Sequence, residues 1–70
     1  MDRVNRIKEV LVIKGKKQKW LAEKLDKSVT TLASICNNKS QPRLIELKKI
    51  AALLDVDIRD LLVSTKEKNG

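Results

Sequence analysis

The residues of this sequence that could do chemistry are mainly cations. Lys and Arg number 16 against 9 Asp and Glu, so the net charge is +7 at neutral pH and the pI is about 9.9. Such an excess favours a polyanionic partner such as nucleic acid, although it can also serve solubility alone. Histidine, the commonest general base and metal ligand, is absent, and the single cysteine, Cys36, cannot complete a zinc site or an internal disulfide. The composition predicts a binding protein without metal or cofactor rather than an enzyme.

The length and the apolar composition predict one small helical domain. A chain of 70 residues buries only about 60% of its unfolded surface, so its core must be economical. Hydrophobic residues make up 41% of the sequence, and Trp20 is the only aromatic among them. Such a core favours short packed helices over a sheet. We expect an all-α domain over residues 1–63 and a polar, flexible tail over residues 64–70.

Targeting signals are not evident in the sequence. The first residues lack an apolar run of signal-peptide length. No later stretch approaches the ~20 apolar residues of a membrane span. We therefore expect a cytoplasmic protein with no membrane partner.

Apolar spacing predicts two helices near the N-terminus. The first apolar set recurs at helical intervals and consists of Val4, Ile7, Val10 and Leu11. Lys14 and Gly15 then make a typical helix end, which predicts a helix over residues 2–14. A second set, Leu21, Ala22 and Leu25, predicts a short helix over residues 18–25.

A third helix is expected directly after a tight turn at Asp26 and Lys27. Ser28 is a good N-cap, because its hydroxyl can accept the backbone N–H of Thr30 or Thr31. The apolar stripe of this helix consists of Leu32, Ile35 and Cys36. A polar loop over residues 37–42 ends it.

The fourth helix has the clearest pattern and is expected over residues 43–54. Its apolar stripe consists of Leu44, Leu47, Ile50, Ala51 and Leu54. Asp57 is placed to cap a short fifth helix, with Asp60 three residues on in the first turn. The apolar face of that helix consists of Ile58, Leu61 and Leu62.

The second and third helices form the most informative feature. Each is about two turns long, and a link of only two or three residues forces them to cross steeply. Ala22 is then expected near the crossing, where a small side chain permits close approach. In this geometry one helix can lie across DNA phosphates while the other enters the major groove. An ordinary helical hairpin in a small bundle is the alternative.

A longer set of residues, at intact spacing, extends this interpretation. It consists of Gln18-Lys19-Trp20-Leu21-Ala22-Glu23-Lys24-Leu25, then Ser28, Leu32, Ile35, Asn37, Lys39 and Pro42, then Leu44, Leu47, Ile50, Ala51, Leu54, Val56 and Leu61. This pattern, which covers Gln18 to Leu62, resembles the phage-repressor-like helix-turn-helix proteins, the XRE or Cro/CI family. The resemblance implies a compact domain of five helices, with the third as the recognition helix.

The resemblance also implies which residues read bases. They are Val29, Thr30 and Ser34, with Ser28, Thr31 and Ala33 beside them. Hydroxyls can donate to or accept from several base edges, and the methyl groups of Val29 and Thr30 can pack on a thymine methyl. No Arg, Asn or Gln occupies the exposed N-terminal half of this helix, so we expect modest specificity or reliance on DNA shape. Alternatively, the hydroxyl residues form a merely solvated face.

Phosphate contacts are implied on both sides of the motif. Those at the start of the second helix are Lys16, Lys17, Gln18 and Lys19, and those after the recognition helix are Asn38, Lys39, Ser40 and Arg43. Gln18 matches the family residue whose side chain and adjacent amide meet a phosphate, an anion that helix N-termini favour.

Five residues depart from the family pattern. Asp26 and Asn38 stand where glycine is usual, and Lys17 replaces the usual capping Thr or Ser. Cys36 replaces a common acidic residue and is interpreted as a small apolar group, with a redox switch as the alternative. Trp20 falls on an often polar position, where it either packs against the helix over residues 2–14 or lies partly exposed beside the phosphate-binding surface.

These observations predict a sequence-specific, double-stranded DNA-binding transcriptional regulator, a repressor. A single module offers a small interface, so we expect a homodimer on a near-palindromic site, with Leu61, Leu62 and Val63 as the dimer surface. The alternative is an antitoxin-type interaction module, which neutralises a partner toxin and regulates its own operon. The neighbouring gene would distinguish the two.

Overall fold

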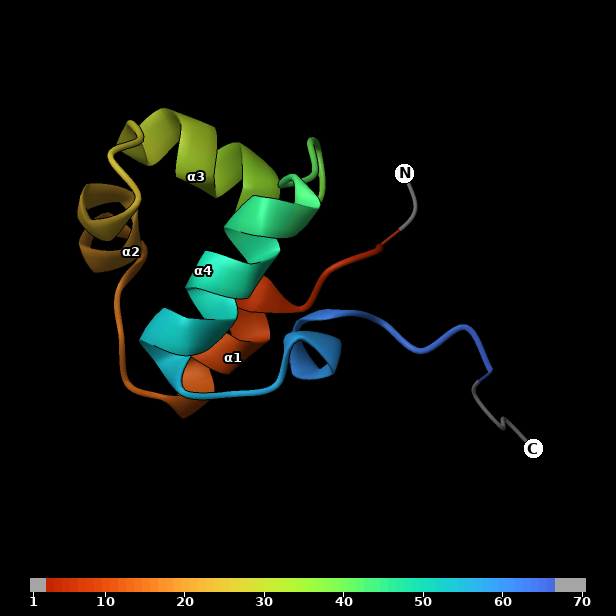
Figure 1. Ribbon diagram of the computed structural model, residues 1–70. Helices are drawn as coiled ribbons and strands as arrows, with labels where there is room; N and C mark the ends of the chain where they lie inside the picture. Colours follow the sequence, from red (N-terminus) through yellow and green to blue (C-terminus); the bar gives the residue numbers. More distant parts are fainter. Residues whose placement is uncertain (1–2, 67–70) are drawn as a thin grey trace.

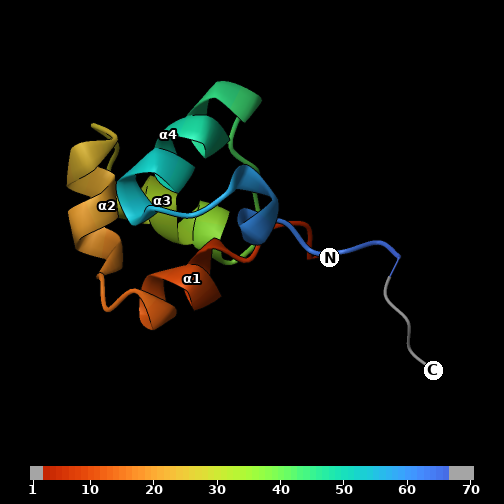
Figure 2. The ribbon, with the colours of Figure 1, turned by 60° about the horizontal axis from the view of Figure 1, so that its bottom comes forward.

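The computed structural model describes residues 3–66, which form four α-helices and one 3-10 turn (Figure 1). The elements are α1 (Ile7–Ile13), α2 (Gln18–Lys24), α3 (Val29–Cys36), α4 (Leu44–Leu54) and the 3-10 turn η1 (Ile58–Leu61). In Figure 1, α3 runs along the top of the molecule and α1 lies at the bottom, and Figure 2 turns α1 toward the viewer. The all-α class is confirmed. Within residues 3–66, none of the helices has the length and apolar character needed to span a membrane.

The expected fifth helix is a single 3-10 turn rather than an α-helix. Asp57 caps it as expected, by accepting the backbone N–H of Arg59 at 2.8 Å. The turn cannot continue because Leu62 is extended (φ −118°, ψ 148°) and pairs with Asn5 in an antiparallel bridge. The segment after η1 therefore runs beside the N-terminal segment (Figure 2).

The first helix begins later than expected for the same reason. Residues 3–6 are not helical, and Arg6 and Val4 instead exchange backbone hydrogen bonds with Leu61 and Val63. The side chain of Asn5 accepts the backbone N–H of Ile7 at 3.1 Å, which helps to start α1. The expected start at Asp2, like residues 67–70 of the expected tail, lies outside the described residues.

The core draws side chains from every element. Its buried members are Ile7, Val10, Leu11, Leu21, Ala22, Leu32, Ile35, Cys36, Leu47, Ile50, Ala51, Leu54 and Leu61. Burying each large aliphatic side chain is worth about 1.5–3 kcal/mol relative to leaving it exposed. Leu44 is an exception to the expected stripe, since it is 75% exposed at the first residue of α4.

Two turns around α3 use the left-handed backbone conformation without glycine. Asp26 (φ 58°) lies between α2 and α3, and Asn38 (φ 60°) follows α3. Asp and Asn tolerate this conformation better than most residues, because their short side chains bond locally. Both substitutions for glycine are therefore compatible with the turns.

A buried polar cluster ties the N-terminal segment to the end of α3. The side-chain oxygen of Asn38 accepts the backbone N–H groups of Val4 (2.8 Å) and Asn5 (2.9 Å). In return, the amide of Asn5 donates to the carbonyl of Ile35 (3.0 Å) and to Gln41 (2.8 Å). Asn5 is 1% and Asn38 7% exposed, so the bonds between these two residues are made away from water, whereas Gln41 is exposed. We call Asn5, Asn38 and Gln41 the asparagine clamp.

The clamp generates the first prediction. Asn5→Ala should lower the free energy of unfolding by about 2 kcal/mol, because it leaves buried partners of the clamp without their hydrogen bonds. Denaturant unfolding followed by circular dichroism measures this. Asn37→Ala, which removes an exposed amide next to the clamp, should stay within about 0.5 kcal/mol of the parent. Equal losses in both variants would contradict the assigned role of the clamp.

Candidate nucleic-acid interface

Helices α2 and α3 pack against each other across a short turn. Figure 1 shows α2 nearly end-on and α3 lengthwise, so the two helices cross steeply. The turn closes through the backbone N–H of Lys27, which donates to the carbonyl of Ala22 at 2.9 Å. Ala22 is 1% exposed, as expected for a small residue near the crossing. Leu21 and Leu32 are both fully buried beneath the two helices, and this holds one face of α3 inward.

The N-terminal end of α3 is turned to solvent. Ser28, Val29, Thr30 and Thr31 are exposed, whereas Ala33 and Ser34 are half-buried. Ser28 caps the helix by accepting the backbone N–H of Thr31 at 3.0 Å, and its hydroxyl also donates to the Thr31 hydroxyl at 2.9 Å. The hydroxyl of Ser34 lies 3.2 Å from that of Ser40. Five of the six expected base-reading residues thus lie on α3 and Ser28 caps it, with Val29 and Thr30 exposed at its start.

The start of α2 carries a group of lysines beside an aromatic ring. Lys16, Lys17 and Lys19 are exposed and, with Trp20, line a shallow hollow of about 400 Å³. No side chain caps the helix at Lys17, so backbone N–H groups at the start of α2 lack a side-chain acceptor. Trp20 is half-buried against the core, and the Lys16 ammonium lies 4.9 Å from its ring centroid. Trp20 is therefore partly packed against the core and partly exposed beside the lysines.

The loop after α3 divides the second group of expected phosphate ligands. Lys39, Ser40 and Arg43 are exposed. Asn38 is buried, and its side chain belongs to the asparagine clamp. The side chain of Asn38 is thus occupied by contacts within the protein, which argues against its expected role at a phosphate.

The pair of Lys27 and Glu46 was not anticipated from the sequence. The Lys27 ammonium lies 2.7 Å from the Glu46 carboxylate, which joins the turn before α3 to the first turn of α4. Glu46 also accepts the backbone N–H of Arg43 at 3.0 Å. The Lys27 contact, and then the Arg43 N–H, lower the pKa of the Glu46 carboxyl. A Glu three residues after the start of the fourth helix was the available signal for the cap, but nothing in the sequence pointed to Lys27.

A family model described as helix-turn-helix matches residues 7–61. The chain belongs to the XRE helix-turn-helix family. It is also similar to a crystal structure of a protein from Bacteroides fragilis to which DNA binding is ascribed. The two chains are 50% identical with a TM-score of 0.84, over 86% of this chain and 97% of the other. No curated protein matches the chain.

One expected member of a dimer surface in this helix-turn-helix protein lies inside the domain. Leu61 is 0% exposed and packs in the core, so it offers no surface to a second chain. Leu62 and Val63 are half-buried beside the N-terminal segment. The expected dimer surface is thereby reduced to these two residues.

Cys36 is a buried thiol at the end of α3. It is 3% exposed, and burial raises the pKa of the thiol to about 11, although nearby Lys8 acts in the opposite direction. Because the thiolate is the nucleophilic form, a thiol with this pKa is unreactive near neutral pH. This favours Cys36 as a small apolar core residue over a redox switch.

The Lys27–Glu46 pair generates a prediction about pH. A carboxyl whose pKa is lowered in the folded state stabilises the protein at neutral pH, and this stability is lost as the pH falls through the lowered pKa. Glu46→Gln should therefore be less stable than the parent at neutral pH and approach it in acid. Unfolding free energies measured against pH test this. A constant difference at every pH would contradict the electrostatic origin.

Proposed function

We propose that this protein binds double-stranded DNA in a sequence-specific manner and regulates transcription, with α3 in the major groove. The observation that carries the proposal is the exposed N-terminal end of α3, which projects hydroxyl and methyl groups from a rigid helix. Family membership and the similarity to the Bacteroides fragilis protein support the same function. They also favour a binding role over a catalytic one.

Base reading is assigned to the exposed start of α3. Thr30 offers a hydroxyl to base edges, and the methyl groups of Val29 and Thr30 fit a thymine methyl. Ser34 lies one turn further on, where its bond to Ser40 couples base reading to the loop. These groups give weaker discrimination than bidentate Arg or Asn contacts would, so the shape of the DNA contributes to specificity.

Contacts to the DNA phosphates are assigned to two groups of residues on either side of α3. The first consists of Lys16, Lys17, Gln18 and Lys19, and the second of Lys39, Ser40 and Arg43. The Lys16 ammonium lies 4.9 Å from the ring centroid of Trp20, a cation–π contact that favours this position. If a monomer neutralises about four phosphates, the slope of log affinity against log salt is about −3.6.

The division into base-reading and phosphate-binding residues can be tested once the preferred site is known. Selecting bound duplexes from a random DNA pool identifies that site. Thr30→Ala should reduce the preference for the selected site over random DNA by about 1 kcal/mol, roughly fivefold. Ser34→Ala should act in the same direction. Lys39→Ala should instead weaken binding to all sequences alike and make the salt slope shallower by about one. Fluorescence anisotropy at several salt concentrations measures both effects.

A matched control for these variants is Thr65→Ala, which removes an exposed threonine hydroxyl far along the chain from α3. It should bind as the parent does. The assignment fails if Thr30→Ala and Lys39→Ala reduce specific and random binding to the same extent.

We propose further that two copies bind a near-palindromic operator and repress by occupying it. Half-sites about 34–36 Å apart would then place both recognition helices in successive major grooves. Leu62 and Val63 are the remaining candidates for the contact between copies.

The dimer generates its own prediction. Light scattering of the protein with a duplex that carries both half-sites should give the mass of two chains on one duplex. A duplex with a single half-site should bind one chain, with lower affinity. Persistent binding of one chain to the complete site would disprove the dimer.

The antitoxin alternative requires a surface for a partner protein in addition to the DNA-binding face. A hollow beside α1, described below, offers such a surface.

A further inference from the structure

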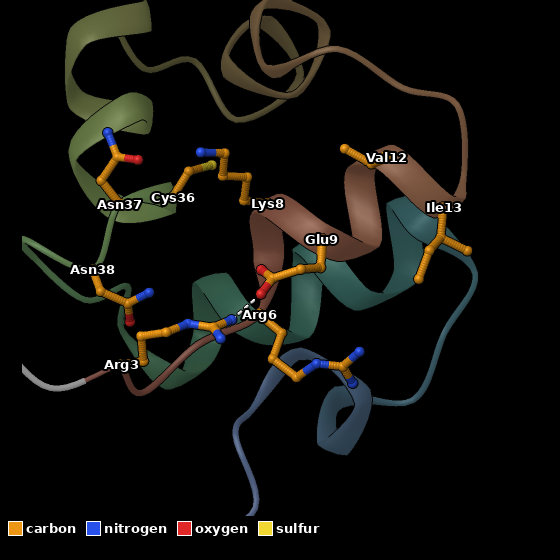
Figure 3. Close-up of a pocket in the computed structure, with 9 residues that line it drawn as sticks. All are labelled: Arg3, Arg6, Lys8, Glu9, Val12, Ile13, Cys36, Asn37 and Asn38. Atoms are coloured by element: carbon orange, nitrogen blue, oxygen red, sulfur yellow. Dashed lines mark hydrogen bonds and ion pairs between the residues drawn. The ribbon is translucent and has the colours of Figure 1, made fainter.

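A hollow of about 730 Å³ opens beside α1, away from the start of α3 (Figure 3). Its walls come from the N-terminal segment, from α1 and from the end of α3. The residues on which the argument depends are Arg3, Arg6, Lys8, Val12, Ile13 and Cys36. We call this surface the α1 groove. Its volume lies within the range of about 300–1,000 Å³ that is typical of binding pockets.

The α1 groove has an unusually exposed apolar wall. Val12 is 74% and Ile13 71% exposed, and they follow each other at the end of α1. Buried Cys36 adds an apolar group on the α3 side. Covering such surface is worth roughly 25 cal/mol per Å², so a partner that buries Val12 and Ile13 together gains binding energy.

The same groove is positively charged. Arg3, Arg6 and Lys8 face it from the N-terminal segment and the first turn of α1 (Figure 3). The carboxylate in the groove, Glu9, is paired with Arg3. Lys8 is exposed, and Arg6 is half-buried with one long contact, 3.4 Å, to the carbonyl of Asp60. Within residues 3–66, the charge that remains unpaired in the groove, on Lys8 and Arg6, is therefore positive.

This combination discriminates between possible occupants. A second copy would bring the same cations against these, and like charges in contact are unfavourable. The DNA backbone would pair with the cations but offers no apolar surface to Val12 and Ile13. A membrane is flat, whereas this surface is a shallow hollow. An acidic segment with an apolar face satisfies the charge, the apolar wall and the shape.

We propose that the α1 groove binds an acidic amphipathic segment of a partner protein. The apolar face of that segment packs on Val12 and Ile13, and its carboxylates pair with Lys8 and Arg6. The groove does not include the proposed base-reading residues, because Val29 and Thr30 lie at the opposite end of α3 from Cys36.

The probe for the test is a labelled peptide of about four helical turns, with leucines at helical spacing on one face and glutamates elsewhere. The same peptide with lysines in place of the glutamates is the charge control. At about 0.15 M salt, where long-range attraction is screened, the acidic peptide should bind saturably and the basic peptide should not. Amide chemical-shift changes should fall on α1 and the end of α3.

Variants of the full chain test the apolar contact and the charge pairing separately. Val12→Ser with Ile13→Ser, and separately Lys8→Glu, should each weaken peptide binding about tenfold or more, equivalent to ~1.4 kcal/mol. The matched controls are Leu44→Ser, which removes an equally exposed apolar side chain, and Lys49→Glu, which reverses a lysine on α4. Both should bind the peptide as the parent does. The Val12 and Ile13 double variant should bind duplex DNA normally.

Three results would overturn the proposal. The first is no saturable binding of the acidic peptide by the parent. The second is an equal loss of binding in the variants and their matched controls, which would indicate general attraction to a basic protein. The third is tighter binding to phosphatidylglycerol vesicles than to the peptide, with loss in the Val12 and Ile13 double variant, which would indicate a membrane surface. None of these depends on whether the protein binds DNA.

Discussion

The close packing of α2 on α3 is the constraint on which the rest of the structure depends. Ala22 brings the two backbones together, and Leu21 and Leu32 are buried beneath them. Because a helix has one face in the core, fixing Leu32 and Ile35 inward turns Thr30 outward, whereas Val29 is exposed because it is the first residue of α3. The exposure of the proposed reading face is thus a consequence of packing, and it requires no interaction of its own.

Rigidity at both ends of α3 comes from polar contacts. At the start, Ser28 caps the helix and Lys27 pairs with Glu46 on α4. At the end, the asparagine clamp holds the chain through residues 30 and 33 positions apart. A helix that is held at both ends can present side chains to a groove without first losing much conformational freedom, which favours specific binding.

The charges and exposed apolar groups are distributed unevenly over the surface. Lysines at the start of α2 and in the loop after α3 flank the proposed reading face, whereas Val12 and Ile13 lie with other cations on α1. Two surfaces of different chemistry on one small domain would allow a regulator to combine two partners. The size of the domain makes this economical, since the same core supports both surfaces.

Local patterns in the sequence were sufficient to predict the helices in the middle of this protein. The extents of α2, α3 and α4, the caps at Ser28 and Asp57, and most of the core follow from apolar spacing and from side chains that bond within a few residues. Such features depend on neighbours in the sequence, so they can be read without knowing which segments meet.

Other features depend on contacts between distant segments. Val4 matches the spacing of the first helix, yet it is extended because the N-terminal segment pairs with residues beyond η1. Asn38 is of a polar type usually found at the surface, but its hydrogen bonds in the clamp bury it. Leu44 fits the apolar stripe of α4, but it remains exposed at the start of the helix. Hydrogen bonds and burial across the fold follow from which surfaces face each other, and periodicity contains no information about that choice.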